Sequence, residues 1–224
     1  MLKRITGGAR CTSNAFTFLE LGVLPISYEI HKRQLSFLHH ILNLDEEDPV
    51  KRMFNNMKQL PGEKNWYNCV VGLLETYNIT MSEEEIKNKS KDPFKTIVRT
   101  AIRKKALADL TQELSKQKKT HTLVYTQLKL QDYLTKLYPW ESKLIFRCRS
   151  KTLDIKTHQT FKYSDTLCRW CSLYDEELSH IINCGEEVMD VPDLNCLEVM
   201  DQGMTTRISR IAHGIQDFLE KVDY

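Results

Sequence analysis

The chain has 224 residues, which is enough for one medium domain or two small ones. Hydrophobic residues make up 41% and charged residues 28%, so we expect a soluble globular protein whose core needs no disulfides, while the net charge of +2 excludes nothing until it is resolved along the chain. No segment approaches the run of about eighteen apolar residues that a membrane helix needs, and no such run follows the basic start of the chain, so we expect neither a membrane span nor a signal peptide.

Apolar residues follow helical spacing through most of the chain and strand-like alternation is rare, which predicts an all-α fold. Pro25 suits the first turn of the first clear helix, and Asp48-Pro49 is a start signal for the second. The charged segment 81–91 opens with a capping-box pattern and forms either a short helix or a loop. The other helices that we expect span residues 26–44, 49–59, 65–78, 92–117, 124–137, 139–153 and 205–222.

The seven cysteines do not fit a disulfide framework, because their number is odd and they are scattered over the whole chain. A reducing intracellular setting, nuclear or cytoplasmic, fits better. Their positions are 11, 69, 148, 168, 171, 184 and 196.

Three of these cysteines and one histidine have the spacing of a metal site. Cys168 and Cys171 are separated by two residues, which is the spacing of a tight turn that points both sulfurs at one place. His180 and Cys184 follow within the same short segment and, being four apart, share one face of a short helix. Four such ligands leave no coordination position open, so the pattern predicts a structural zinc ion rather than a catalytic one.

Two other interpretations of these residues remain. The four residues could be ordinary parts of a core, although the second pair at helical spacing argues against this. Cys168 and Cys171 could also form a thioredoxin-like redox pair, but the βαβ surroundings expected for that role are missing. We divide the chain into a multi-helix body, residues 1–153, and a zinc-knuckle tail with a terminal helix, residues 154–224. Residues 185–201 within this tail are acidic and loop-like.

The small net charge conceals strong local asymmetry. Between residues 87 and 119 there are eleven basic residues against three acidic ones, and Lys95, Arg99 and Arg103 share one helix face. Such a run can bind phosphates, although a solvated helix face is the more common explanation. A second basic segment, residues 143–169, includes Arg147, Arg149 and Lys151.

Arg169 and Trp170 stand between the first two expected zinc ligands. At the tip of a knuckle, an indole can stack on a nucleic-acid base and an arginine can contact a phosphate. Trp170 could instead pack on the terminal helix.

Residues 138–153 (Tyr-Pro-Trp-Glu-Ser-Lys-Leu-Ile-Phe-Arg-Cys-Arg-Ser-Lys-Thr-Leu), together with the cysteine and histidine motif, resemble the C-terminal region of reverse transcriptases from long interspersed (non-LTR) retrotransposons. In that family a helix with a leucine, arginine, leucine pattern precedes a Cys-Cys-His-Cys knuckle, and Arg147 fits the arginine position. Segments 9–15, 20–25 and 33–38 resemble the helical region that follows the polymerase thumb, so the resemblance spans nearly the whole chain.

The resemblance implies a fragment or derivative of such an enzyme without its chemistry. The family's catalytic turn, of the type Tyr-X-Asp-Asp, binds magnesium, and this sequence has no Asp-Asp pair. Gly185 follows the last ligand where the family often has proline. Pro192-Asp193 resembles a nuclease element of some relatives, but the acidic residue and lysine that complete it do not follow. We therefore expect no enzymatic activity.

Taken together, these patterns predict a non-catalytic nucleic-acid-binding module derived from a retrotransposon reverse transcriptase and stabilised by zinc. Its partner would be RNA or DNA, bound largely through phosphates, and a separate polymerase chain is a candidate protein partner. The alternative is a helical protein-interaction module in which the zinc is purely structural and no nucleic acid is bound.

Overall fold

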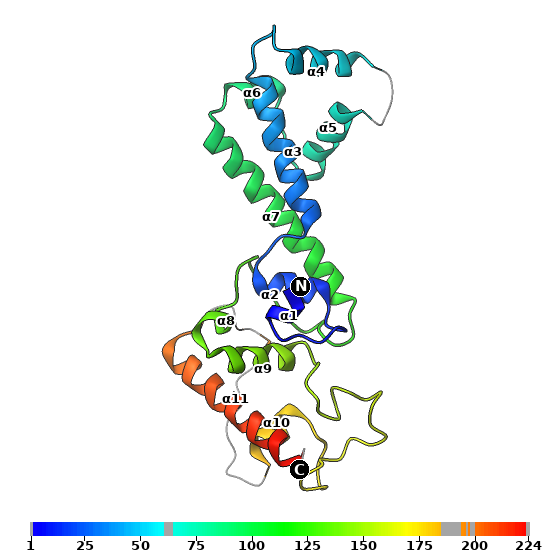
Figure 1. The fold of residues 1–224 in the computed structure, drawn as a ribbon, viewed down its shortest axis with the longest axis vertical. Helices are drawn as coiled ribbons and strands as arrows, with labels where there is room; N and C mark the ends of the chain where they lie inside the picture. Colours follow the sequence, from blue (N-terminus) through cyan, green and yellow to red (C-terminus); the bar gives the residue numbers. More distant parts are fainter. Residues whose placement is uncertain (1, 61–64, 185–193, 196, 198–199, 223–224) are drawn as a thin grey trace. The chain divides into compact units, whose positions relative to one another are not determined.

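The computed structural model describes residues 2–60, 65–184, 194–195, 197 and 200–222, and these residues form eleven helices and no strand (Figure 1). The predicted all-α fold is confirmed. Most of the expected acidic loop, residues 185–201, lies outside the described residues. Within the described part, no helix is both long and apolar enough to cross a bilayer.

The chain divides into two compact units, residues 24–109 and residues 1–23 together with 110–224. This division differs from the expected one after residue 153, because the N-terminal residues pack with the second half of the chain. The long helix α7 (Lys91–Ser115) begins in one unit and ends in the other.

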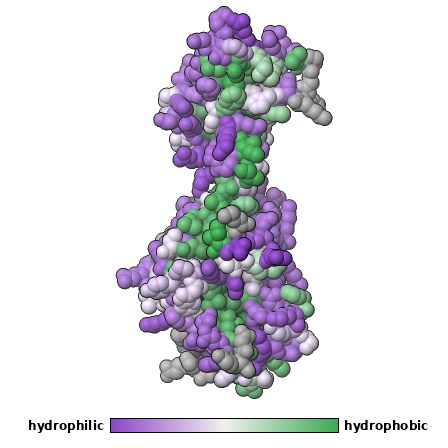
Figure 2. All heavy atoms as spheres, viewed as in Figure 1, coloured by the Kyte–Doolittle hydropathy of each residue, from purple (hydrophilic) through white to green (hydrophobic). Residues whose placement is uncertain are grey.

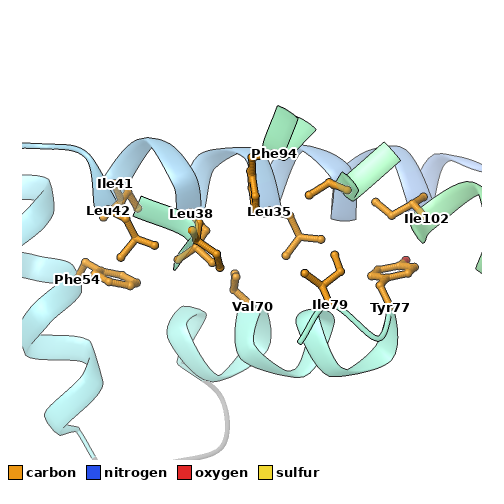
Figure 3. Packing of buried hydrophobic residues seen from close by; sticks show 12 residues of the cluster. Leu35, Leu38, Ile41, Leu42, Phe54, Val70, Tyr77, Ile79, Phe94 and Ile102 are labelled. Carbon is orange, nitrogen blue, oxygen red and sulfur yellow. The ribbon is translucent and has the colours of Figure 1, made fainter. Parts of the chain in front are cut away.

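The unit of residues 24–109 is built around α3, which contacts α4, α5 and α6. Its helices are α3 (Ile26–Leu42), α4 (Pro49–Gln59), α5 (Trp66–Thr76), α6 (Glu83–Asn88) and the first part of α7. Figure 3 shows its core, in which the side chains of these helices face one another. The core residues are Leu35, Leu38, Ile41, Leu42, Phe54, Val70, Tyr77, Ile79, Ile86, Phe94, Val98 and Ile102.

The helix starts in this unit agree with the capping signals. The Asp48 side chain accepts the Val50 N–H at 2.8 Å and so satisfies one of the free donors at the start of α4. Ser82 and Glu85 form a reciprocal capping box, with both hydrogen bonds present. The segment 81–91 therefore contains a short helix, α6, rather than only a loop.

The second unit contains the two terminal parts of the chain. Its helices are α1 (Leu2–Ile5), α2 (Asn14–Leu21), the end of α7, α8 (Tyr133–Lys136), α9 (Pro139–Arg149), α10 (Leu178–Asn183) and α11 (Gln202–Val222). The helix α11 packs against α9 and α10. The hydroxyl of Ser209 on α11 donates a hydrogen bond to the buried carboxylate of Glu141 on α9 at 2.6 Å.

The predicted helix 124–137 is wrong, because only the single turn of α8 is helical there. Leu123 and Tyr125 are buried while Val124 between them is exposed, which is the alternation of an extended chain. The backbone of Lys129 also passes so close to Gly22 that a Cβ on this glycine would lie 2.2 Å from the lysine carbonyl carbon. The segment is therefore shaped by the partners it packs against rather than by its own periodicity.

A buried ion pair joins the N-terminal residues to α9. Arg149 donates to Glu20 Oε1 from Nη2 at 2.8 Å and from Nε at 3.1 Å, and neither side chain is exposed to solvent. The hydroxyls of Tyr125 and Tyr133 also donate to the Glu20 carboxylate. Burial and the nearby Glu20 charge raise the pKa of Tyr125 well above its usual value, so both tyrosines stay neutral donors. Arg149 additionally donates to the Leu194 carbonyl.

We predict that Arg149→Met strongly destabilises the unit of residues 1–23 and 110–224. The substitution leaves the Glu20 carboxylate buried without its counter-charge, and breaking such a pair costs about 3–5 kcal/mol. Urea unfolding followed by circular dichroism measures this loss.

The matched control is Arg147→Met, on the same helix but with an exposed side chain that, among the described residues, donates only to the Gly7 carbonyl. This change should cost no more than about 1 kcal/mol, as for an ordinary surface contact. Equal losses in the two variants would contradict the role assigned to the buried pair.

Candidate metal centre

The first two ligands of the candidate metal centre lie in a tight hairpin. Leu167 and Asp175 pair as an isolated antiparallel bridge, and the Cys168 N–H donates to the Tyr174 carbonyl at 2.8 Å. Between them the Ser172 N–H donates to the Cys168 carbonyl at 2.9 Å, and Ser172 has a left-handed backbone with φ of 57°. This turn brings the Cys168 and Cys171 sulfurs to the same side of the loop.

The other two ligands come from α10. His180 lies within this helix and Cys184 follows its last residue. The ligand atoms of Cys168, Cys171, His180 and Cys184 all lie within 4.8 Å of one another. The Cys168 and Cys184 sulfurs are 3.8 Å apart, and the Cys171 sulfur is 3.3 Å from His180 Nε2. The four residues are therefore placed so that they can hold one metal ion.

Backbone N–H groups prepare two of the sulfurs for this role. The Trp170 N–H points at the Cys168 sulfur at 3.4 Å, and the Leu173 N–H points at the Cys171 sulfur at 3.5 Å. The bond from Leu173 is the main reason that the pKa of the Cys171 thiol is lowered to about 6. The pKa of Cys184 is instead raised to about 12, first by burial and then by the neighbouring sulfurs. The sulfurs therefore oppose ionisation of Cys184, and a cation bound among them would favour its thiolate.

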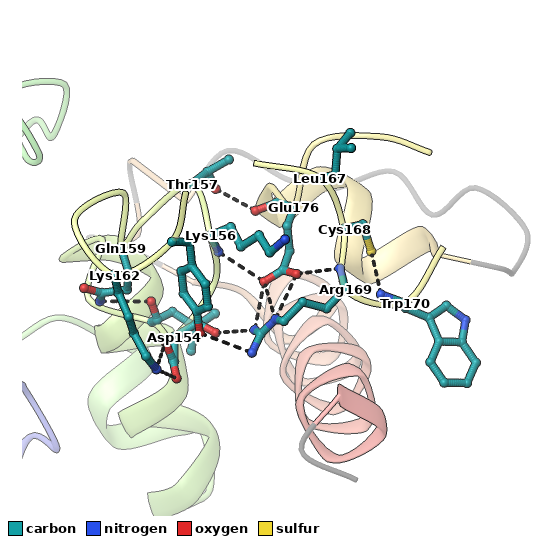
Figure 4. Close-up of polar contacts among 12 residues, drawn as sticks. Asp154, Lys156, Thr157, Gln159, Lys162, Leu167, Cys168, Arg169, Trp170 and Glu176 are labelled. Atoms are coloured by element: carbon teal, nitrogen blue, oxygen red, sulfur yellow. Dashed lines mark hydrogen bonds and ion pairs between the residues drawn. The ribbon is translucent and has the colours of Figure 1, made fainter. Parts of the chain in front are cut away.

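The buried carboxylate of Glu176 holds the hairpin through several hydrogen bonds (Figure 4). Glu176 is fully buried, and its oxygens accept the Arg169 N–H at 2.9 Å and the Lys156 N–H at 3.1 Å. The Arg169 guanidinium pairs with the same carboxylate at 2.8 Å. Arg169 also donates to the Asp154 carbonyl at 2.7 Å and to the Tyr163 hydroxyl at 3.3 Å.

This arrangement corrects the role predicted for Arg169. The guanidinium does not project from the tip of the knuckle toward a phosphate, because it is occupied by Glu176 and by the chain around residue 154. The nucleic-acid contact predicted for Arg149 is corrected as well, because this side chain is buried and paired with Glu20. Both arginines hold the fold and are not available to nucleic acid.

The other predicted contact residues near the knuckle remain at or near the surface. Trp170 is 52% exposed, and the Lys221 ammonium of α11 lies 5.4 Å from its ring centroid. Trp170 thus lies beside the terminal helix, and about half of it stays exposed; stacking on a base stays a prediction. Arg147 is exposed and Lys151 is half-buried at the end of α9, where its left-handed backbone, with φ of 49°, ends the helix before the predicted residue 153.

Lys95, Arg99 and Arg103 lie on α7, in the unit of residues 24–109 and not in the unit that holds the metal cluster. Lys95 and Arg99 are exposed, and Arg103 is half-buried. The predicted basic residues thus belong to two different units.

Three residues of these networks were not singled out from the sequence. Glu176 looks like a helix-start acid, Lys221 looks like an ordinary cation of a last helical turn, and Glu20 looks like one polar residue in an apolar run. Glu176 lies 7 residues from Arg169, and Lys221 lies 51 residues from Trp170. Glu20 lies 129 residues from Arg149. No local pattern encodes such pairings.

Comparisons with protein-family models, with curated proteins and with solved structures found no match to this chain. The interpretation of the site therefore depends on its own geometry.

We predict that Glu176→Gln weakens metal binding by roughly tenfold or more, as is usual when a residue that orients metal ligands is lost. The neutral amide cannot pair with the Arg169 guanidinium, so the turn between Cys168 and Cys171 is held less firmly. Competition with a chelator of known affinity measures the change.

The control is the neighbouring Glu177→Gln. Glu177 is exposed, and its side chain accepts a hydrogen bond only from the Ser179 hydroxyl among the described residues. Metal affinity should be unchanged in this variant. If both variants bind metal as tightly as the unaltered chain, the carboxylate of Glu176 does not support the site.

Proposed function

We propose that Cys168, Cys171, His180 and Cys184 bind one zinc ion, and that the protein is a non-catalytic nucleic-acid-binding module related to the C-terminal region of non-LTR retrotransposon reverse transcriptases. The relationship is supported by the knuckle spacing and by the arginine-bearing helix upstream of it. The non-catalytic assignment is supported by the lack of an Asp-Asp pair in the sequence.

The geometry of the cluster fits zinc. Zinc–sulfur bonds of about 2.3 Å in a tetrahedron place two sulfurs roughly 3.8 Å apart. The distance between the Cys168 and Cys184 sulfurs is 3.8 Å. Three thiols and one imidazole are also ligands that zinc prefers, and four protein ligands leave no open position for a reacting group. The zinc would therefore be structural and would stabilise the hairpin and α10.

One observation carries the nucleic-acid proposal, namely a row of exposed cations on α7. Lys91, Lys95 and Arg99 are each four residues apart, lie on one face and are exposed. None of the three forms an ion pair within the described part of the chain, so their charges are available to phosphates.

A separate groove of about 590 Å³ also lies along α7, and none of these three cations lines it. The hydroxyls of Thr96 and Thr100 and the ammonium of Lys104 line it from α7, with Asn78 on the other side. Lys104, Thr100 and Asn78 can donate to a phosphate oxygen without reading a base, whereas the Thr96 hydroxyl already donates to the Asp92 carbonyl at 3.0 Å. We expect binding to depend on backbone charge with little sequence preference.

The knuckle offers a second contact of a different kind. The half-exposed Trp170 ring, with the Lys221 ammonium beside it, presents a flat surface and a cation, as in sites where bases stack on aromatic rings. This contact favours single-stranded nucleic acid, because only unpaired bases expose their faces.

We predict one zinc ion per chain in protein purified without added metal. Cys184→Ser should remove it, together with part of the helical content, because α10 loses its link to the hairpin. Zinc binding displaces protons from the thiols and the imidazole, so affinity should fall as pH falls from 8 toward the Cys171 pKa of about 6 and below. Elemental analysis and circular dichroism measure these changes.

The control is Cys69→Ser, which removes an exposed cysteine outside the cluster and should leave the zinc content unchanged. A chain that carries no zinc and takes up none when zinc is supplied would remove the metal proposal.

We predict that Lys95→Ala combined with Arg99→Ala weakens binding to a short mixed-sequence RNA. Loss of two phosphate contacts should make the slope of log affinity against log salt shallower by about 1.4, that is, about 0.7 for each contact with a single strand. Fluorescence anisotropy over a series of salt concentrations measures the slope.

A matched control removes two exposed cations from the other unit, Arg10→Ala with Arg210→Ala. Net charge changes equally in both double variants. If the two variants lose affinity and salt dependence equally, binding follows net charge and the row on α7 is not the site.

A further inference from the structure

A strip of apolar side chains on α3 faces solvent. Ile26 is 75% exposed, Ile30 is 48% exposed and Phe37 is 46% exposed. With Arg33 and His40 they follow a spacing of four, three, four and three residues, which places all five on one seam of the helix. The core of this unit instead uses Leu35, Leu38, Ile41 and Leu42 of α3. The helix therefore has a second apolar face that the unit does not bury.

The seam leads into a groove between α3, α4 and Trp66 at the start of α5, whose ring lies edge-on to Phe37 at a centroid distance of 5.6 Å. This cavity has a volume of about 340 Å³. Phe54 and Ile41, each 2% exposed, form its floor, while Phe37, Val50 and Met53 form walls that are partly open to solvent. Figure 2 shows hydrophobic residues reaching the surface among hydrophilic ones in the part of the chain that contains these helices. Unbranched methionine adapts to different side chains, which suits a groove that accepts a bulky apolar residue.

The shape of the strip indicates a helix as its occupant. A seam with alternating spacings of three and four is complementary to a second helix with the same pattern. From Ile26 to His40 it is roughly 21 Å long at about 1.5 Å per residue, so a helix of about four turns covers it.

The positive charge of Arg33 on the seam determines which kind of partner helix can bind. Neighbouring charges are internally paired, Glu29 with Lys32 and Glu47 with Arg52. Arg33 forms no ion pair within the described ranges and lies at the centre of the seam. In an in-register dimer of two such seams, parallel or antiparallel, Arg33 would face Arg33 of the second copy. Like charges placed opposite each other are unfavourable, so a second copy is not the best occupant.

We propose that this seam and groove bind an amphipathic helix of another protein, with apolar residues at spacings of three and four and an acidic residue opposite Arg33. The apolar residues cover Ile26, Ile30 and Phe37, and one large side chain enters the groove beside Met53. The acidic residue pairs with Arg33 and sets the register. This surface lies on α3 and α4, whereas the proposed phosphate-binding row lies on α7, so the two proposals can fail separately.

The test uses two synthetic helical peptides of about three heptads with leucine at the seam positions. One peptide carries glutamate at the central seam position and the other carries lysine. Fluorescence anisotropy measures their binding to the full chain at peptide concentrations where the peptides are monomeric. We expect the glutamate peptide to bind at least about tenfold more tightly than the lysine peptide, and we expect Arg33→Glu to reverse this preference. Equal binding of both peptides, a preference that Arg33→Glu leaves unchanged, or no binding of either peptide overturns the proposal.

Met53→Glu should abolish peptide binding, because it places a charge at the mouth of the groove. Met53 is 55% exposed, so the fold should tolerate this change. The control Val124→Glu alters an apolar side chain of similar exposure, 58%, in the other unit and should leave peptide binding intact. Lys95→Ala with Arg99→Ala should also leave it intact, which separates this surface from nucleic-acid binding. If the chain sediments as a dimer that Met53→Glu dissociates, a second copy occupies the strip and the proposed partner is wrong.

Discussion

The buried pair of Glu20 and Arg149 is the constraint on which the larger unit depends. It connects residues near the start of the chain to α9, and the free donors of Arg149 extend the connection to the Leu194 carbonyl. Two charges taken out of water are tolerated only when every remaining hydrogen-bonding group is satisfied. The hydroxyls of Tyr125 and Tyr133 complete the set around the carboxylate. The segment from Tyr125 to the start of α8 at Tyr133 is consequently held in a non-helical course, which its helical periodicity does not predict.

The hairpin that carries Cys168 and Cys171 also depends on a buried carboxylate paired with an arginine. A hairpin of this size buries little apolar surface, so its shape depends on polar contacts, to which the proposed zinc would add. Glu176 supplies the polar part, because one buried carboxylate accepts both the backbone of the turn and the Arg169 guanidinium. The Trp170 N–H and the Leu173 N–H point at the two sulfurs of the same turn, so backbone and carboxylate contacts together fix its shape.

Sequence reasoning succeeded where the determinant is local. Asp48 and Ser82 predict helix starts because a cap satisfies donors only two or three residues away. Cys168, Cys171, His180 and Cys184 were grouped by their short spacings, and their ligand atoms lie within 4.8 Å of one another. The same reasoning failed for residues 124–137, where contacts with distant residues outweigh helical periodicity, and for Arg149 and Arg169. An arginine that pairs with a distant buried carboxylate has the same appearance in a sequence as one that faces water, so local charge counts overestimate the cations available at the surface.

Only cations that form no ion pair within the protein can bind a charged partner, which limits the surfaces on which we propose binding. The guanidinium groups of Arg149 and Arg169 form ion pairs inside the larger unit. Lys95 and Arg99 on α7 and Arg33 on α3 form no ion pair in the described part of the chain. The unit of residues 24–109 thus carries available cations in two different settings. On α7, Lys95 and Arg99 share one exposed helix face with Lys91, which supports the proposed contacts to a phosphate backbone. On α3 a single arginine interrupts an apolar seam, which suits one acidic group on an otherwise apolar partner. The two settings select different ligands. The row of cations on α7 attracts a polyanion through its summed charge. Arg33, surrounded by apolar side chains, instead favours a single ion pair in a partly dehydrated environment, where the pair is less screened.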